Sequence, residues 1–304
     1  MTAPPRLPPS MRFVERDWLS ANGVLFDDGR HAALVDTGYV KHRDLTLALV
    51  RRALGDRPLD LVVNTHLHSD HCGGNAALQA AFGARTLIPE ASADAVRDWD
   101  GRLTYASTGQ RCDRFGFDGT LEDGATVELG GLSWRVIAAP GHDPDSVILH
   151  CESERILISA DALWANGFGI VFPELEGESG FAEQRAILER IDGLAVSLVL
   201  PGHGPMFTDV RGALRTARQR LDRLAADPAN NARYAAKALL KYLLLDRERI
   251  ALDEVPALMR SVRVTMEANR RYLGLSVEAL SDWTVGELVR AGAARIAGAE
   301  LFNA

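Results

Sequence analysis

Within six positions the chain carries four potential metal ligands, namely His66, His68, Asp70 and His71. Three of the chain's eight histidines fall in this stretch. Imidazole nitrogens and carboxylate oxygens suit zinc, iron and manganese. Because one ion needs only three or four protein ligands, four ligands here and any that follow downstream suggest two ions. The alternative, a polar surface loop that happens to hold three histidines, fits this clustering poorly.

The residues on either side predict where these ligands lie. The apolar, β-branched run at 61–63 predicts a buried strand, and the glycine-containing turn at 72–75 predicts the start of a helix. The ligands are therefore expected on a loop at the carboxyl end of a strand, where open α/β sheets place their chemistry. His66 and His68 are two residues apart, so their side chains leave an extended backbone on the same side.

The string at positions 66–71 resembles the H-x-H-x-D-H signature of the metallo-β-lactamase fold superfamily, and the resemblance covers residues 10–210 approximately. Later candidates fall in the order of that family, since His142, Asp161 and His203 each follow an apolar, strand-like run. Upstream, Asp36 lies in a matching Val-Asp-Thr-Gly motif. In the family this carboxylate supports a metal ligand through a hydrogen bond.

The resemblance implies a complete ligand set for two divalent transition-metal ions, with zinc favoured and iron or manganese as alternatives. One ion would be held by His66, His68 and His142, the other by Asp70, His71 and His203, and both by Asp161. Asp70 and Asp161 would be the catalytic carboxylates, Asp70 by orienting the nucleophile or handling a proton. Two cations about 3.5–4 Å apart hold a water molecule and lower its pKa, which supplies a bridging hydroxide at neutral pH.

The implied function is a dinuclear metal-dependent hydrolase acting on an ester, thioester, lactone or phosphodiester. The ligand pattern is similar to that of glyoxalase II and lactonase relatives, whereas true β-lactamases usually carry Cys at the position of Asp161. One alternative is an oxidoreductase resembling persulfide dioxygenases, which keep the same string but bind a single iron. A second alternative is a metal protein with a DNA-binding tail. Iron content with oxygen uptake would test the first alternative, and a DNA gel shift the second.

Length and composition limit the class of protein. A chain of 304 residues allows one large core and a small second domain. The net charge of −7 argues against nucleic acid as the main partner. No apolar run is long enough to span a membrane, and the first residues lack the pattern of a signal peptide. The three scattered cysteines are interpreted as reduced thiols, so we expect a cytoplasmic protein. We also expect it to act on a small molecule.

The chain changes character after residue 208. We expect residues 1–211 to form an αββα sandwich of the metallo-β-lactamase type, an α/β fold, and residues 212–304 a helical C-terminal module. The stretch 292–298 resembles the end of a winged-helix unit. From residue 216 onward, Lys and Arg outnumber Asp and Glu by only 14 to 11, which makes DNA binding a weak hypothesis. Completing the rim of the pocket, or forming a homodimer, is favoured instead.

Several segments have two interpretations that the sequence leaves open. Tyr39 and Lys41 could line the mouth of the site or be solvated loop residues. Asp145 stands where many relatives carry Gly, and it either adds negative charge near the metals or belongs to a surface turn. Residues 100–120 could form a lid over the substrate or an exposed helix without a role.

Three aromatic residues follow the predicted ligand Asp161 along the chain. They are Trp164, Phe168 and Phe172. Either they form an apolar wall of the pocket or they pack in the core, and their spacing does not separate these possibilities.

Overall fold

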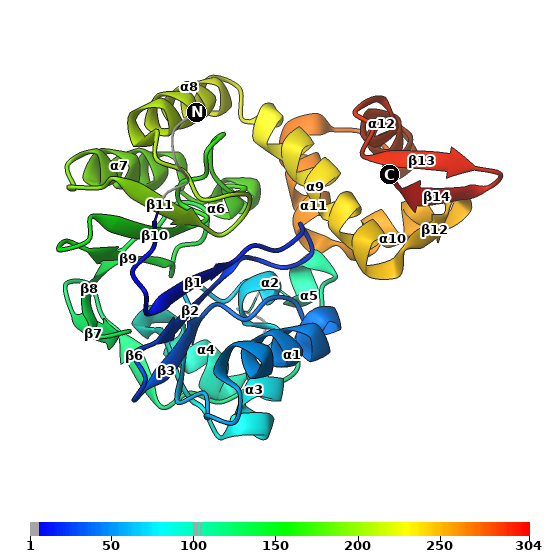
Figure 1. Ribbon diagram of the computed structural model, residues 1–304. Helices are drawn as coiled ribbons and strands as arrows, with labels where there is room; N and C mark the ends of the chain where they lie inside the picture. Colours follow the sequence, from blue (N-terminus) through cyan, green and yellow to red (C-terminus); the bar gives the residue numbers. More distant parts are fainter. Residues whose placement is uncertain (1–5, 100–102, 104) are drawn as a thin grey trace.

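The computed structural model describes residues 6–99, 103 and 105–304 and contains a sandwich of two sheets (Figure 1). The first sheet has the strand order β1-β2-β3-β4-β5-β6. Its strands are β1 (Met11–Val14), β2 (Gly23–Asp27), β3 (Ala32–Val35), β4 (Leu61–Val63), β5 (Arg85–Pro89) and β6 (Gly119–Leu121). The pairs from β1 to β3 are antiparallel and those from β3 to β6 are parallel.

The second sheet has the strand order β11-β10-β9-β8-β7. Its strands are β7 (Thr126–Leu129), β8 (Leu132–Ala138), β9 (Val147–Cys151), β10 (Ile156–Ala160) and β11 (Leu198–Pro201). All pairs are antiparallel except β10 with β11. This one parallel pair matters for the site, because it brings the carboxyl ends of β10 and β11 to the same edge.

Helices cover the outer face of each sheet (Figure 1). On the first sheet lie α1 (Arg43–Leu54), α3 (Asn75–Phe82) and α4 (Ala93–Asp98), and on the second α7 (Phe181–Asp192) and α8 (Val210–Ala226). The alternation along β2 explains the layers. Val24 and Phe26 pack between the two sheets, whereas Leu25 packs against α1 and α3. The predicted αββα sandwich is therefore confirmed.

Short helical segments connect the main elements. They are η1 (Val40–His42), α2 (Ser69–Cys72), η2 (Glu90–Ser92), α5 (Tyr105–Thr108) and α6 (Phe172–Glu176). The stretch 100–120, predicted as a lid or an exposed helix, contains α5 and the start of β6. Residues 100–102 and 104 of that stretch lie outside the described residues.

The C-terminal module is mainly helical, as predicted, and projects from the sandwich (Figure 1). It consists of α9 (Ala229–Arg247), β12 (Arg249–Ala251), η3 (Leu252–Glu254), α10 (Val255–Ser261), α11 (Arg263–Ala268), η4 (Asn269–Leu273), α12 (Val277–Arg290), β13 (Ala294–Ala297) and β14 (Glu300–Asn303). The strands form a small antiparallel sheet, β12-β14-β13. The stretch 292–298, which resembles the end of a winged-helix unit, contains β13, the first strand of a hairpin with β14.

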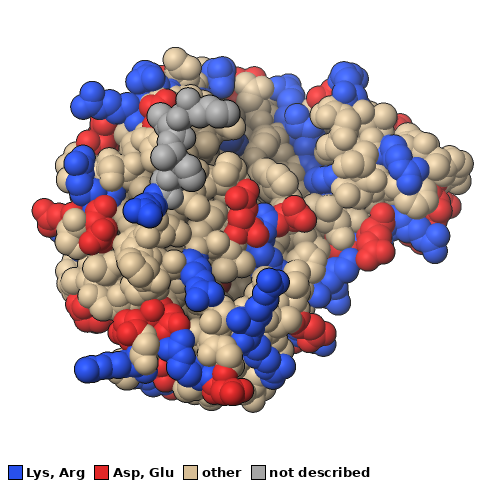
Figure 2. All heavy atoms as spheres, in the orientation of Figure 1, with Lys and Arg blue, Asp and Glu red and all other residues tan. Residues whose placement is uncertain are grey.

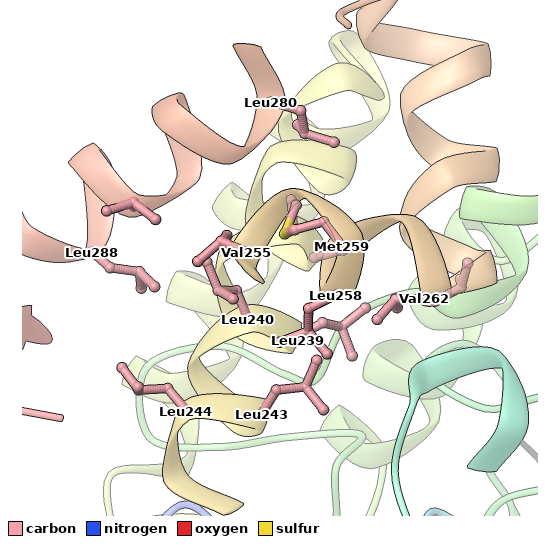
Figure 3. Close-up of a cluster of buried hydrophobic side chains, with 14 of the residues drawn as sticks. Leu239, Leu240, Leu243, Leu244, Val255, Leu258, Met259, Val262, Leu280 and Leu288 are labelled. Carbon is pink, nitrogen blue, oxygen red and sulfur yellow. The ribbon is translucent and has the colours of Figure 1, made fainter. Parts of the chain in front are cut away.

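Helix α8, most of which falls within the predicted module at 212–304, packs against α7 of the sandwich. Its buried Leu214 and Leu221 lie in one hydrophobic cluster with Ile187 and Leu188 of α7. A separate cluster joins α9 to α10 and α12, with Leu240, Val255 and Leu288 among its members (Figure 3). The predicted division at residues 211 and 212 remains a prediction.

Charged side chains are spread over the face shown in Figure 2, where Lys and Arg alternate with Asp and Glu on both the sandwich and the module. Within the described residues, no helix is long and apolar enough to cross a membrane.

Candidate metal centre

The seven predicted ligands converge at one edge of the sandwich. Each lies a short distance beyond the carboxyl end of a strand, because His66, His68, Asp70 and His71 follow β4, His142 follows β8, Asp161 follows β10 and His203 follows β11. Among the described residues, the candidate metal-binding groups are His66, His68 and His142; His66, His71 and Asp161; and Asp70, His71 and His203. The atoms of each group lie within 4.8 Å of one another.

The first group consists of three buried imidazoles facing one another. Nδ1 of His68 lies 3.1 Å from Nε2 of His66 and 2.7 Å from Nε2 of His142. Three ring nitrogens converging on a small volume can satisfy only part of their hydrogen-bonding capacity with each other. Such a convergence of lone pairs suits a cation.

The second group combines a carboxylate with two imidazoles. Oδ2 of Asp70 lies 3.1 Å from Nε2 of His203 and 3.9 Å from Nε2 of His71. The carboxylate of Asp161 lies between the two groups, with Oδ1 3.5 Å from Nε2 of His71 and Oδ2 3.4 Å from Nε2 of His142. Asp161 therefore contacts residues of both groups.

Hydrogen bonds to the other ring nitrogen orient two of the imidazoles. Nδ1 of His142 donates to the Ile170 carbonyl at 2.5 Å, and Nδ1 of His71 donates to Oδ2 of Asp36 at 2.8 Å. Each bond leaves Nε2 to face the site. Asp36 is itself fixed, since it also accepts from the Thr65 backbone N–H at 2.9 Å and from the Thr65 hydroxyl at 2.8 Å. The predicted contact of Asp36 with a candidate ligand, His71, is present.

The electrostatics of the first group favour neutral imidazoles. Burial, together with the neighbouring imidazoles, lowers the pKa of His66 and His68 well below the usual value. Burial also lowers the pKa of His142. A neutral imidazole has a free lone pair, which is the form that binds a metal.

In the second group the electrostatics favour the charged forms of His71 and Asp161. Burial would lower the pKa of His71, but the carboxylates of Asp36, Asp161 and Asp70 raise it well above the usual value. Burial raises the pKa of Asp161, yet His203 and His71 outweigh it and hold that pKa well below the usual range. Buried carboxylates at this point therefore require positive charge beside them.

A buried ring nitrogen at the site lacks a hydrogen-bond partner within the described part of the chain, and a metal ion would provide the missing interaction. Nε2 of His71 is buried and has no hydrogen-bond partner among the described residues, although it faces the carboxylates of Asp161 and Asp70. A buried, unpaired polar atom is costly, and a cation at this point would remove the cost. The residues present therefore fit one or two divalent cations.

Asp143, which the sequence analysis did not select, contributes the extra acid near these ligands. Its Oδ2 lies 3.3 Å from Nε2 of His68, and burial with the nearby Asp145 raises the pKa of Asp143 to about 7. Asp145 itself accepts a hydrogen bond from the Ser92 hydroxyl at 3.0 Å and does not line the cavity beside the candidate ligands, which is described below. The extra carboxyl group near the candidate ligands is therefore that of Asp143, not Asp145. In the sequence, only the position of Asp143 directly after His142 could have indicated this.

Two glycines allow the ligands to approach the backbone. A Cβ atom at Gly202 would lie 2.2 Å from Oδ1 of Asp161 and 3.0 Å from Cε1 of His71. A Cβ atom at Gly169 would lie 2.3 Å from Nδ1 of His142. The sequence analysis missed both, because the need for glycine arises from contacts between distant segments.

A cavity of 80 Å³, which we call the metal-site cavity, opens onto the candidate ligands and has aromatic walls. Trp164 and Phe172 line it, which is one of the two interpretations left open for them, and the Trp164 indole N–H donates to Oδ1 of Asp161 at 3.2 Å. Phe168 is fully buried in the core and does not line the cavity. Trp18, another residue that the sequence analysis missed, stacks on His203 with ring centroids 5.1 Å apart.

Neither Tyr39 nor Lys41 lines this cavity, so the first of the two interpretations left open for them, a place at the mouth of the site, is wrong. Tyr39 is fully buried and packs edge-on against Tyr242 of α9. Lys41 donates to the Asp246 carbonyl at 2.6 Å and pairs with Glu248 at 3.0 Å. Both residues hold the sandwich to the end of α9.

The C-terminal module completes the cavity wall. Four side chains of α9 line it, namely Tyr234, Ala238, Leu239 and Tyr242. The Tyr242 hydroxyl also donates to the Leu19 carbonyl at 3.2 Å. The predicted role of the module at the rim of the pocket is confirmed.

Comparison with known proteins agrees with this geometry. The sequence model of the metallo-beta-lactamase superfamily matches residues 16–203. The chain belongs to this superfamily. A solved metallo-beta-lactamase family protein from Thermus thermophilus has the same fold, with a TM-score of 0.57 and 20% identity over 98% of this chain and 100% of that one.

The curated relatives match this chain over part of their length. The chain is 28% identical to the Beta-lactamase-like protein 2 homolog of Caenorhabditis elegans over 62% of this chain and 57% of that protein. It is 27% identical to a Hydroxyacylglutathione hydrolase of Mesorhizobium japonicum over 71% of this chain and 73% of that protein. A Hydroxyacylglutathione hydrolase of Hyphomonas neptunium is 33% identical, but the match spans only 36% of each chain.

Proposed function

We propose that the protein is a dinuclear metal-dependent hydrolase of an ester, thioester, lactone or phosphodiester. The observation that carries this proposal is the position of Asp161, whose two carboxylate oxygens face different groups of candidate ligands. Relatives named hydroxyacylglutathione hydrolases support the thioester end of this range. The cavity beside the candidate ligands gives the reacting group of a substrate access to them.

The residues divide into two sets of ligands and a shared carboxylate. His66, His68 and His142 would hold one ion, Asp70, His71 and His203 the second, and Asp161 both. Zinc is the metal that this nitrogen-rich donor set favours, with iron and manganese as alternatives. When bound, two such ions supply Lewis-acid polarisation of a carbonyl or phosphoryl group and activation of a water molecule.

The chain's own residues orient and enclose this chemistry. Asp36 holds the ring of His71, and the Trp164 indole N–H holds one oxygen of Asp161. Oδ2 of Asp70 faces the cavity beside Nε2 of His203, where it can accept a proton from the substrate side. Trp18 and Phe172 restrict the entry of water and strengthen the electrostatic interactions inside.

Metal analysis combined with a panel of substrates tests the proposal. Protein expressed with sufficient zinc should hold two equivalents per chain and hydrolyse at least one member of a panel of thioesters, esters, lactones and phosphodiesters. Chelation should remove the activity, and returned zinc should restore it. A firm single equivalent of iron, with oxygen uptake on glutathione persulfide and no hydrolysis, would contradict the proposal and identify a dioxygenase instead.

A further inference from the structure

A second cavity, of 310 Å³, lies beside the metal-site cavity and runs along the C-terminal module. Four residues line both cavities: Trp18, Tyr234, Ala238 and Tyr242. Farther along, the wall of the second cavity consists of side chains from α9 and from the end of α12, including Leu245, Leu288 and Ala291. We call this second cavity the module groove. It adjoins the metal-site cavity, with which it shares these four lining residues.

The two lysines of the module groove already have partners within the module. Nζ of Lys241 donates to the Ala293 carbonyl at 2.5 Å and to the side chain of Asn303. Nζ of Lys237 lies 3.8 Å from a carboxylate oxygen of Glu287. With these charges engaged, the remaining wall is predominantly leucine, alanine and aromatic rings. An apolar chain can pack along these side chains.

Trp18 connects the groove to the metal centre. It is 56% exposed, unusual for so large an apolar side chain, and its ring stacks on that of the candidate ligand His203. Its edge meets Trp164, which donates to Asp161. An apolar chain that leaves the metal centre along the groove would cover the exposed part of Trp18, and burial of that surface is favourable.

We propose that the module groove binds an apolar chain attached to the ester or thioester that is cleaved at the metal centre. The inference rests on the hydrolase function proposed above, and it specifies the substrate class as amphipathic, with the reacting carbonyl at the metals and the chain between Trp18 and α12. The groove volume falls in the range of about 300–1,000 Å³ that is usual for small-molecule sites.

The dependence of kcat/KM on chain length tests the groove in the metal-loaded, full-length protein. With p-nitrophenyl esters from acetyl to octanoyl, kcat/KM should rise by about fourfold per methylene until the groove is filled, the equivalent of ~0.8 kcal/mol. A parallel series of acetate esters with lengthening alcohols shows which side of the bond carries the chain. If both series are flat, the proposal is wrong.

Obstruction of the groove provides a matched pair of variants. Ala291 is exposed at the C-terminus of α12 and lines the groove, so A291W should fill it. The variant should lower kcat/KM for the long-chain substrate by at least about tenfold more than for the acetyl substrate. Ala226 is equally exposed, at the end of α8, and does not line the groove. A226W should keep the ratio of the parent protein, and an equal ratio in A291W would overturn the proposal.

Ligand binding separates failure of the groove from failure of the hydrolase function. Calorimetric titration with octanoate and with octan-1-ol should show binding that A291W weakens by at least about tenfold, whereas acetate should bind equally to both proteins. If the long-chain ligands bind but no ester is cleaved, the groove stands and the hydrolase function falls. If esters are cleaved without dependence on length and no long-chain ligand binds, the groove falls and the hydrolase function stands.

Discussion

The sandwich and the C-terminal module bury different kinds of side chain. At the edge of the sandwich, imidazoles and carboxylates are buried together beyond the ends of β4, β8, β10 and β11. The central cluster of the module instead consists of aliphatic side chains and one methionine (Figure 3). Rigid strands can hold ligands in fixed positions, whereas an apolar helical packing provides wall and shape. We therefore propose that the sandwich supplies the reacting groups and that α9 and α12 select the substrate.

The largest expected effect comes from removing the shared carboxylate. Asp161→Ala should lower turnover by at least about a hundredfold, on the scale of one lost electrostatic element of the transition state. It should also reduce metal content towards one equivalent, because Asp161 contacts both ligand groups whereas His66, His68 and His142 remain. Metal stoichiometry and hydrolysis are measured on the same preparation. Two retained ions with near-normal turnover would rule out the bridging role.

Asp145→Ala is the matched control for that variant. This carboxylate also follows a candidate ligand closely, but it accepts its hydrogen bond from Ser92 and lies outside the metal-site cavity. Metal content should remain at two equivalents. A loss as large as that of Asp161→Ala would show that the loop after His142, rather than the bridging carboxylate, controls the site.

A smaller loss should follow from one methyl group at Gly202. In Gly202→Ala the new Cβ would be only 2.2 Å from Oδ1 of Asp161, so the carboxylate must move. Displacement of a catalytic group by about 1 Å can reduce activity on the order of a hundredfold, and we expect between tenfold and that value. Gly116→Ala is the control, because nothing lies within 4 Å of its added Cβ. Equal activity of the two variants would contradict the tight approach of Gly202.

The convergence of the candidate ligands was predictable because it depends on local order along the chain. A buried strand followed by a histidine or aspartate places that side chain at the sheet edge, whatever the rest of the fold does. This logic applies to His66, His142, Asp161 and His203, each of which lies just beyond a strand. The supporting role of Asp36 followed from its motif, and its bond to His71 agrees.

The remaining features depend on contacts between segments far apart in the sequence. Trp18 meets His203, and Tyr242 of α9 meets Tyr39, only after the whole chain has folded. Composition could not distinguish Phe168 in the core from Phe172 on the cavity wall, since both are phenylalanines only four positions apart. The pattern along the chain gives each element its buried face, but it does not give the neighbour that the face meets.

Changes in the module core should affect stability more than metal binding. Leu240 is buried at the centre of the module cluster, and Leu240→Ala should lower the free energy of unfolding by about 2–5 kcal/mol through the cavity that it leaves. Metal content of the folded protein should stay at that of the parent. Leu275→Ala is the control, because Leu275 is 40% exposed. Denaturant unfolding and metal analysis check both statements, and loss of metal in folded Leu240→Ala would contradict the division of roles.

The smallest effect is expected at an exposed ion-pair network of the module. Glu267 on α11 accepts hydrogen bonds from Arg270 and Arg271, and the bond from Arg270 is the main cause that lowers the pKa of Glu267 to about 2 from its ordinary value of 4.5. Because the folded-state pKa is the lower one, the stabilisation is complete above pH 4.5 and fades as the pH falls from 4.5 towards 2. Water and salt screen so exposed a network, so Glu267→Gln should lower the melting temperature at pH 7 far less than Leu240→Ala does. The difference from the parent should shrink in 1 M salt, where the Debye length is about 3 Å, and at pH 3. A large loss that persists in salt would show that Glu267 acts through packing, and that the module depends on buried polar contacts as the sandwich does.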